Sequence, residues 1–346
     1  WCAVLTLLLK LETALQPQTQ SSGRDALRLG FFVVGIQMIL TTGAAARYAA
    51  PKSRLAYGTA GFRANAALLD STFYRMGMLA ALRSRAASAK PAAATCKRPL
   101  AVGLMVTASH NPQADNGIKL VDVDGGMLSQ AFEPRATAVA NASSAELPAL
   151  LGAIAAEEGG AGSGGVVLVA RDTHSHSARF ATIALEGAAV AGAEVVDLGL
   201  LTTPQLHHMV RFRNGEAGGS GRFVGDASWA TEDGYYDMLS GAFLKLLGGR
   251  TCAPLGVDCA HGIGAPQLAK LGSRLAEKLP LRIANAPGDG ELNLGCGAEH
   301  CQKAREPPAG YWCAASTPRD ISPPQHPTGV APSREQLPNL PYAAPR

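Results

Sequence analysis

The sequence is poor in charged and in aromatic residues, which make up 17% and 5% of its 346 residues. Its net charge of +4 is small for this length, and Lys and Arg do not cluster anywhere along the chain. Proteins that bind nucleic acid usually carry a basic patch or stripe, so we expect no nucleic-acid partner. A weak positive balance suits a phosphorylated metabolite as the ligand.

Long apolar runs are lacking as well. The two candidates, "LTLLL" at residues 5–9 and "FFVVGIQMIL" at residues 31–40, are much shorter than the ~20 residues that a membrane-spanning helix needs. We therefore expect no membrane partner. Residues 1–43 also lack the basic start and the cleavage site of a signal peptide, and we interpret them as an extension that precedes the globular part.

The seven cysteines are irregularly spaced, and no second pair joins Cys296 and Cys301 to complete a zinc pattern. Reduced thiols are typical of cytosolic proteins, so we expect a cytoplasmic location. Because Cys259 stands close to His261, one possible role for it is that of a nucleophile. A core cysteine at the end of a strand is favoured, because nothing in the sequence marks its pKa as lowered. The sequence carries no signal for an oligomeric state.

Residues 44–310 show the alternation of strands and helices that predicts βαβ units and an α/β fold. The predicted strands are residues 100–108, 117–121, 164–172, the start of 194–205, the start of 254–279, and 281–286. The predicted helices are residues 70–87, 177–193, 231–248 and the end of 254–279. The stretch 194–205 is expected to end in a turn. Asp258 is expected to cap the turn that follows its strand and to have no catalytic role.

Two of these helices show an apolar face at helical spacing. The first has Asp70 or Ser71 as its expected N-cap. Its predicted apolar face consists of Phe73, Met76, Leu79 and Leu82, and that of residues 231–248 consists of Tyr235, Leu239, Phe243 and Leu246.

Glycine and proline divide the chain into segments. The stretch "NGEAGGSG" at residues 214–221 is the best linker, so we expect one domain at 44–213 and a second at 214–306. Residues 307–346 hold 10 of the 22 prolines and show no apolar period, and we predict a disordered tail there.

The stretch "TASHNPQADNGIKLVD" at residues 107–122 follows a predicted buried strand. Open α/β sheets bind ligands where strands deliver polar loops at their carboxyl ends. Pro112 stiffens this loop, and a stiff loop suits a serine, Ser109, that presents its oxygen for phosphoryl transfer. His110 and Asn111 can donate hydrogen bonds to phosphate oxygens, and Lys119 can neutralise charge. The alternative is a capped turn with a solvated Ser and His.

A second loop, "YGTAGFR" at residues 57–63, places two glycines around Thr59 and ends in Arg63. Its backbone N–H groups and guanidinium could bind a phosphate. The alternative is a simple tight turn at Gly58 and Gly61.

Two other patterns have ordinary explanations. Gly262 and Gly264 lack the third glycine of a dinucleotide loop, so a helix-entry turn is favoured. His207 and His208 would point to different faces of a helix, which disfavours a metal pair and leaves a solvated helix end.

Together, "YGTAGFR", "MVTASHNPQADNGIKLVD", "RDTHSHS", "GLLTTPQLHHMV", "TEDGYY" and "VDCAHGIGA" resemble, in order, the phosphoacetylglucosamine mutases of the α-D-phosphohexomutase superfamily over about residues 44–308. The resemblance implies two mixed-sheet α/β domains of the phosphohexomutase type. The family's C-terminal domains, which recognise the sugar and clamp the distal phosphate, are missing from the sequence, and residues 1–43 are a non-family extension. This pattern is expected of a truncated or mis-spliced gene model.

The resemblance also implies the chemistry. Ser109 would be carried as phosphoserine and would interconvert N-acetylglucosamine 6-phosphate and 1-phosphate through a 1,6-bisphosphate, on the way to UDP-N-acetylglucosamine. Mg²⁺ would bridge that phosphate and three aspartates. His110 and Lys119 match positions that act around the proton transfers, and Arg63 matches a phosphate-contacting arginine. Thr59, Asn111 and Lys119 complete the expected phosphate-binding residues.

The sequence departs from this family in two places. The metal loop Asp-Gly-Asp-x-Asp-Arg should follow residues 296–310, but Asp320 is the only acidic residue near there, and one carboxylate cannot form a hard-cation site. His174 stands where an arginine is expected. We therefore expect the chain to be inactive, or nearly so, as a mutase.

Two other functions remain as alternatives. A phosphoglucomutase or phosphomannomutase is disfavoured, because "RDT" follows the serine loop here and usually precedes it in those relatives. A non-catalytic binding fragment is the alternative from a different class, and the absence of the metal loop favours it.

Overall fold

The structure, a computed structural model, describes residues 48–90, 93, 98–158, 164–215, 227–306 and 308. The predicted extension at 1–43, nearly all of the proline-rich tail and most of the glycine-rich linker lie outside the described residues. No helix of the described part is long and apolar enough to cross a membrane.

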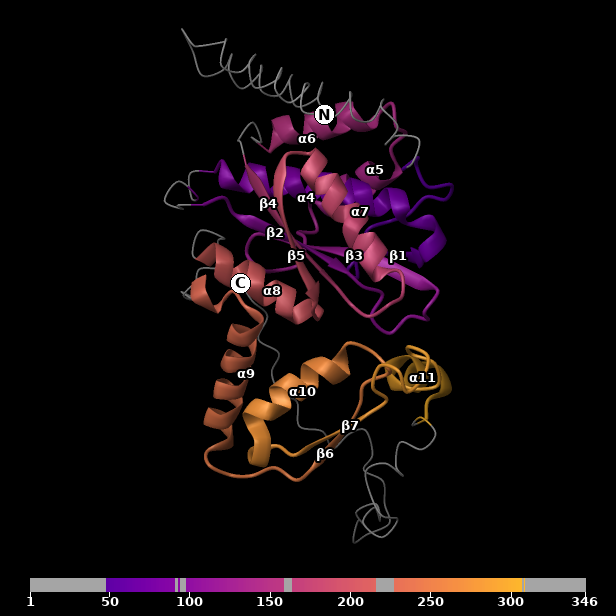
Figure 1. Cartoon of the computed structure of the whole chain (residues 1–346). Coiled ribbons are helices and arrows are strands. Elements are labelled where there is room, and N and C mark those ends of the chain that lie inside the picture. Colours follow the sequence, from indigo (N-terminus) through magenta and orange to yellow (C-terminus); the bar gives the residue numbers. More distant parts are fainter. Residues whose placement is uncertain are drawn as a thin grey trace, which may run out of the picture.

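A five-stranded mixed sheet forms the centre of the first unit (Figure 1). Its strand order is β1-β3-β2-β4-β5. The strands are β1 Phe62–Asn65, β2 Ala101–Val106, β3 Asp115–Val121, β4 Gly165–Arg171 and β5 Ala193–Leu200. β2, β4 and β5 run parallel, whereas β3 pairs antiparallel with β1 and β2. The predicted strands are therefore confirmed, and the serine loop is the connection between β2 and β3.

Helices cover both faces of this sheet, which explains why β2 is buried along its whole length. α4 (Asp70–Ser88) and α7 (Ser177–Val190) pack on one face, with α5 (Glu133–Asn141) and α6 (Leu147–Glu157) beside α4. α8 (Thr203–Asn214) packs on the other face, against a second apolar cluster that includes Met105, Val121 and Leu206.

The helix at residues 70–87 is confirmed, but two of its predicted details are wrong. The N-cap is Leu69, which makes no side-chain cap bond, and Asp70 is already the first helical residue. The helix is also buried nearly all round rather than on one face, because it lies between the sheet, α7 and α5. Gly77 permits this packing, since a Cβ there would lie 2.1 Å from the backbone oxygen of Ala184 on α7.

The turn expected at the end of 194–205 is instead the start of α8. Thr202 and Gln205 form a capping box there, and Pro204 occupies the first turn. His207 and His208 lie within this helix and not at a solvated end. His208 is buried, and its Nε2 lies 2.7 Å from the carbonyl of Trp229, while His207 Nδ1 lies 2.8 Å from that of Gly125. The two side chains do point to different partners, as the i, i+1 spacing predicted.

The second unit is built around two parallel strands in the described part of the chain, β6 (Leu255–Asp258) and β7 (Leu281–Ala284). They are joined through α10 (Gly264–Leu275) and preceded by α9 (Glu232–Leu247); α11 (Gly297–Ala304) follows. Three 3-10 helices complete the described elements: η2 Ala66–Leu68, η5 Ala227–Trp229 and η6 Ala276–Lys278. On α9 the predicted apolar face is only partly buried, and Leu246 is 81% exposed.

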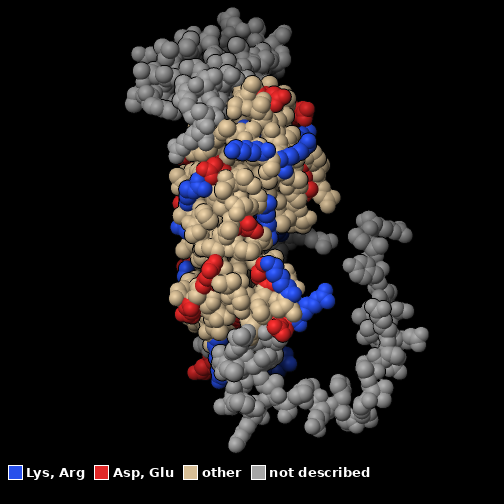
Figure 2. Space-filling model, turned by 90° about the vertical axis from the view of Figure 1, so that its right-hand side faces the viewer, with Lys and Arg blue, Asp and Glu red and all other residues tan. Residues whose placement is uncertain are grey.

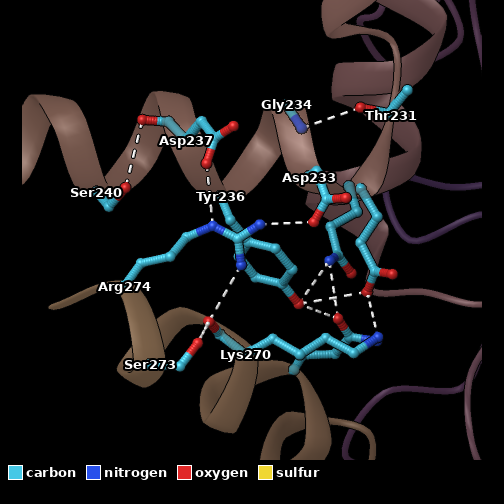
Figure 3. A network of polar contacts seen from close by, with 12 residues as sticks. Thr231, Asp233, Gly234, Tyr236, Asp237, Ser240, Lys270, Ser273 and Arg274 are labelled. Carbon is cyan, nitrogen blue, oxygen red and sulfur yellow. Dashed lines mark hydrogen bonds and ion pairs between the residues drawn. The ribbon is translucent and has the colours of Figure 1, made fainter. Parts of the chain in front are cut away.

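A polar network joins the two units (Figure 3). Tyr236 of α9 is buried, and its hydroxyl contacts Gln205 of α8 and Gln267 of α10. The guanidinium of Arg274 lies over the Tyr236 ring and pairs with carboxylates of α9. Because the buried amides satisfy one another here, the network fixes α10 against α8 and so sets the position of the second unit.

Candidate active site

A cavity of about 670 Å³ lies between the two units. Its walls come from the carboxyl ends of β2, β4, β5 and β6 with the segments that follow them, from α9 and α10, and from the segment after β7. Ser109 and His110 line it from the segment after β2, Asp172 and His174 from that after β4, and Asp258 from the end of β6. The polar loop that follows the predicted strand at 100–108 thus lines this cavity.

Ser109 stands at this cavity in the left-handed conformation, with φ of 56°, and is exposed. A non-glycine residue rarely adopts this conformation unless its surroundings hold it there. Its N–H donates to Thr107 Oγ1 at 2.9 Å, and its carbonyl accepts from Asn293 Nδ2 at 3.0 Å. The backbone of Ser109 is therefore fixed on both sides at a residue that lines the cavity.

Asn293 is a site residue that sequence reasoning missed. It belongs to the second unit, is buried, and also donates at 2.8 Å to the carbonyl of Asn111. Its own N–H bonds the carbonyl of Ala260 at 3.0 Å, so it bridges the loop after β6 and the serine loop. The only sequence signal was an asparagine in the glycine-containing stretch "GELNLG", which is typical of a left-handed turn.

Three predicted phosphate-binding residues lie beside the serine loop but not among the residues that line the cavity. Arg63 Nη1 donates to Asn111 Oδ1 at 3.2 Å, and Asn111 Nδ2 donates to Asp115 at 3.1 Å. Lys119 lies near Arg63 on the adjoining strand. Partial burial, and then the positive charge of Arg63, lower the pKa of Lys119. Burial also lowers the pKa of Arg63, against the opposing effect of Asp172.

Thr59 is exposed at the tip of a turn closed by hydrogen bonds between Gly58 and Gly61. Gly61 has φ of 78°, and a Cβ there would lie 2.3 Å from the carbonyl oxygen of Ile118. The glycine is therefore required for the close approach of this turn to β3. The turn does not bring Thr59 to the cavity lining.

Asp172 and His174 form a buried pair below the serine loop. His174 Nδ1 lies 2.9 Å from Asp172 Oδ2, and the Ser177 hydroxyl donates to Asp172 Oδ1 at 2.7 Å. Burial raises the pKa of Asp172, but the bonds and charge of His174, with bonds from Ser177 and Thr107, outweigh it and lower that pKa. The buried carboxylate therefore stays ionised.

The residues around Cys259 fit the structural alternatives. Burial raises the pKa of the Cys259 thiol, and Asp258 raises it further, which disfavours a nucleophile. Asp258 accepts from the N–H of Ala260 and so caps the turn, as expected, and it also accepts from Gly297 N–H at 2.7 Å. Gly264 opens α10, so the turn at Gly262 and Gly264 is a helix entry.

Within the described residues no group of three or more His, Cys, Asp or Glu is arranged to hold a metal ion. The two carboxylates at the cavity are already engaged, because Asp172 accepts from His174 and Ser177, and Asp258 from three N–H donors. This part of the chain therefore does not fit the expected magnesium site.

Comparisons with known proteins agree with this geometry. The family "Phosphoglucomutase/phosphomannomutase, alpha/beta/alpha domain I" matches residues 88–147 and 141–219. The phosphoacetylglucosamine mutase of Sus scrofa is 41% identical over 262 residues, which are 74% of this chain and 45% of that protein. That of Arabidopsis thaliana is 40% identical over 273 residues, 75% of this chain and 45% of that protein.

Solved structures show the same relation. The N-acetylphosphoglucosamine mutase of Aspergillus fumigatus superposes with a TM-score of 0.69 at 35% identity, over 80% of this chain and 49% of that chain. A structure of the same enzyme in complex with GlcNAc-6P and magnesium gives a TM-score of 0.67 at 35% identity, over the same shares. The chain spans about half the length of the relatives it matches. In sequence and in its α/β fold, it is thus similar to the N-terminal half of the phosphoacetylglucosamine mutases of the α-D-phosphohexomutase superfamily.

Proposed function

We propose that this chain is the serine-bearing half of a phosphoacetylglucosamine mutase. In this proposal Ser109 carries a phosphoryl group and interconverts N-acetylglucosamine 6-phosphate and 1-phosphate through a 1,6-bisphosphate, in the supply of UDP-N-acetylglucosamine. The enzymatic relatives at 35–41% identity support the reaction class. The cytoplasmic location and the division into domains at 44–213 and 214–306 stay predictions.

The single observation that carries the proposal is the conformation of Ser109. A left-handed serine whose backbone is bonded on both sides, and which faces a cavity between two units, is positioned at a cost in backbone strain. Such strain is typical of functional sites and is not needed in a solvated turn. It therefore favours the phosphoryl carrier over the alternative of a capped turn.

The residues near Ser109 divide the chemistry between them. When the phosphoserine reacts, the bond between its phosphorus and Oγ breaks and Oγ takes up a proton. A sugar hydroxyl oxygen bonds the phosphorus and loses its proton. His110 lines the cavity beside Ser109 and is the proposed acceptor of that proton. Lys119 and Arg63 supply positive charge next to the loop, and the lowered pKa of Lys119 makes this lysine a better proton carrier than an exposed one.

Magnesium is seen in a related structure and would neutralise phosphate charge when bound. The described residues provide Ser109 and no set of carboxylates beside it. For this reason we propose that the chain shows no mutase turnover by itself with Mg²⁺ and a bisphosphate. Clear turnover would contradict this part of the proposal.

The test is phosphopeptide mapping of residues 101–120 in protein isolated from its own cell, together with the intact mass. We expect phosphate on Ser109. In a protein completed by the C-terminal half of a relative, Ser109→Ala should abolish turnover, because no other hydroxyl occupies this position. Ser129→Ala, at an exposed serine away from the cavity, is the matched control and should keep activity. Absence of phosphate in all preparations, or activity in Ser109→Ala, would overturn the carrier role.

The second candidate is a non-catalytic fragment that binds a sugar phosphate. The observation in its favour is that the two cavity carboxylates are both engaged by donors within the chain. A mass near 35.7 kDa without phosphate on Ser109 would favour this candidate.

A further inference from the structure

His174 occupies a position where the family resemblance calls for a permanently charged arginine. It follows β4, is 3% exposed, and lies between the Asp172 carboxylate and the serine loop. Its Nδ1 is 2.9 Å from Asp172 Oδ2, and its Nε2 is 3.3 Å from the backbone carbonyl oxygen of Asn111. One buried ring therefore connects the end of a central strand to the loop that carries Ser109.

Both atoms that face this ring can only accept hydrogen bonds. A carboxylate oxygen and a backbone carbonyl oxygen have no proton to donate. A neutral imidazole has one donor and one acceptor nitrogen, so it can satisfy one of the two contacts and must direct a lone pair at the other oxygen. The two contacts exist together as hydrogen bonds only when both nitrogens carry protons.

We propose that His174 is held as an imidazolium cation and acts as a positioning residue that anchors the serine loop, residues 107–114, to the end of β4. The cation replaces the charge of the expected arginine, but it can be lost by deprotonation. The anchor is therefore present while both ring nitrogens carry protons and is released when the ring loses its second proton.

The charged groups around the ring favour the cation. Asp172 is buried beside it and is kept ionised by bonds from Ser177 and Thr107. Arg63, on β1, is near enough to Asp172 to be influenced by its charge, and Asp258 and His110 line the same cavity from β6 and from the serine loop. The nearest charge to the imidazole ring is thus a carboxylate in direct contact, which stabilises a proton on each nitrogen.

The anchor shares its target with Asn293. The carbonyl of Asn111 accepts from Asn293 Nδ2 at 2.8 Å as well as from His174. When His174 is neutral, its Nε2 lone pair faces this carbonyl and the second bond is lost. The serine loop then depends on Asn293 and on the bond of Arg63 to the Asn111 side chain.

The test is an NMR titration of the full chain, labelled with ¹⁵N in histidine and in the backbone, from about pH 5 to about pH 8, the range in which histidines change charge. We expect a proton on each ring nitrogen of His174 while the serine loop is anchored. The amide resonances of Ser109 and Asn111 should shift with the same midpoint as the ring. Loop resonances that stay in place when the ring loses its second proton would overturn the inference.

Two variants separate positioning from simple packing. His174→Gln presents one donor end and one acceptor end, so it satisfies only one of the two oxygens. We expect the Asn111 amide to exchange its hydrogen roughly tenfold faster in this variant at mildly acidic pH, the ratio that a hydrogen bond to a charged group commonly contributes. His174→Arg keeps a charge and should restore slow exchange that no longer depends on pH. His174→Arg still contains His110. Any change in amide resonance that persists in this variant as the pH changes is therefore caused by His110 and not by residue 174.

This inference deepens the proposed function and rests on it only for the catalytic consequence. The titration is made on protein without phosphate, so its result does not depend on whether Ser109 carries a phosphoryl group. An anchored loop without phosphate on Ser109 would contradict the mutase proposal and support the role of His174. Phosphate on Ser109 together with a neutral His174 would support the mutase proposal and contradict the role of His174.

Discussion

The two units contain the same β-α-β order but bury it to different extents. In the first, β4 and β2 are buried along almost their whole length, with helices on both faces of the sheet. In the second, β6 and β7 stay half exposed, with Leu255 49% and Ile283 36% exposed. Local sequence patterns thus specify a β-α-β unit in both places, but only the first unit supplies enough packed elements to close a core around it.

The second unit is therefore held largely by contacts to the first. Tyr236 and Gln267 bond Gln205 of α8, and Asn293 bonds the serine loop. On the face shown in Figure 2, Lys and Arg lie interspersed with Asp and Glu among the described residues, and most of this surface is uncharged. Buried polar contacts therefore join the two units beside the cavity.

The largest expected difference concerns leucines. Leu79 is fully buried in the first unit, so Leu79→Ala should lower the free energy of unfolding by ~2–5 kcal/mol through lost burial and a cavity. Leu246, which is 81% exposed in the second unit, should change it by less than about 0.5 kcal/mol when replaced by Ala. Urea unfolding measures both. Equal losses would show that the second unit buries Leu246 in solution.

Glycines give the next effect. Gly77→Ala places a methyl group 2.1 Å from the carbonyl of Ala184 and should destabilise the chain by about 1–3 kcal/mol, since α4 and α7 must separate. Gly241→Ala, on α9, meets no atom within 4 Å and should stabilise the chain by up to ~1 kcal/mol through helix propensity. Thermal unfolding of the two variants tests the comparison, and a loss of stability in Gly241→Ala would contradict it.

Asn293 tests the connection between the units. Asn293→Gly keeps the left-handed backbone, φ 62°, but removes both bonds to the serine loop, and should cost about 1–3 kcal/mol and speed hydrogen exchange at Ser109. Asn285→Gly is the control, because Asn285 is also left-handed, φ 55°, and bonds Asp258 instead of the loop. Faster exchange at Ser109 in both variants would mean that the whole second unit, and not Asn293, restrains the loop.

The smallest effect is a pH dependence in alkali. Burial raises the pKa of Tyr57 to about 12, because the phenolate would be desolvated. The hydrogen bond from Leu120 N–H acts in the opposite direction and lowers this pKa. The unfolded chain, with an ordinary pKa near 10, releases this proton first. The stabilising contribution is complete below about pH 10 and is lost as the pH rises toward 12. Tyr57→Phe should flatten this part of the urea-unfolding profile, and an unchanged slope would contradict the assignment.

The site could be predicted in part. The loop at Ser109 and His110, and its place at a strand end, follow from an apolar run that stops at a polar stretch. Thr59 was expected to bind phosphate, but spacing gives no information on whether a turn reaches the cavity. Asn293 could not be found from sequence, because its two partners lie 184 and 182 residues away along the chain.

The sequence by itself determined six of the seven described strands and four of the eight described α-helices, since hydrophobic period and turn residues act over a few residues. It also determined the resemblance that names the chemistry. Only the tertiary structure decided that α4 is buried all round, that residues 203–214 form a helix with a buried His208, and that His174 lies between a carboxylate and a carbonyl. Burial and hydrogen-bond partners are properties of the packed chain, because they depend on which distant segments fold against one another.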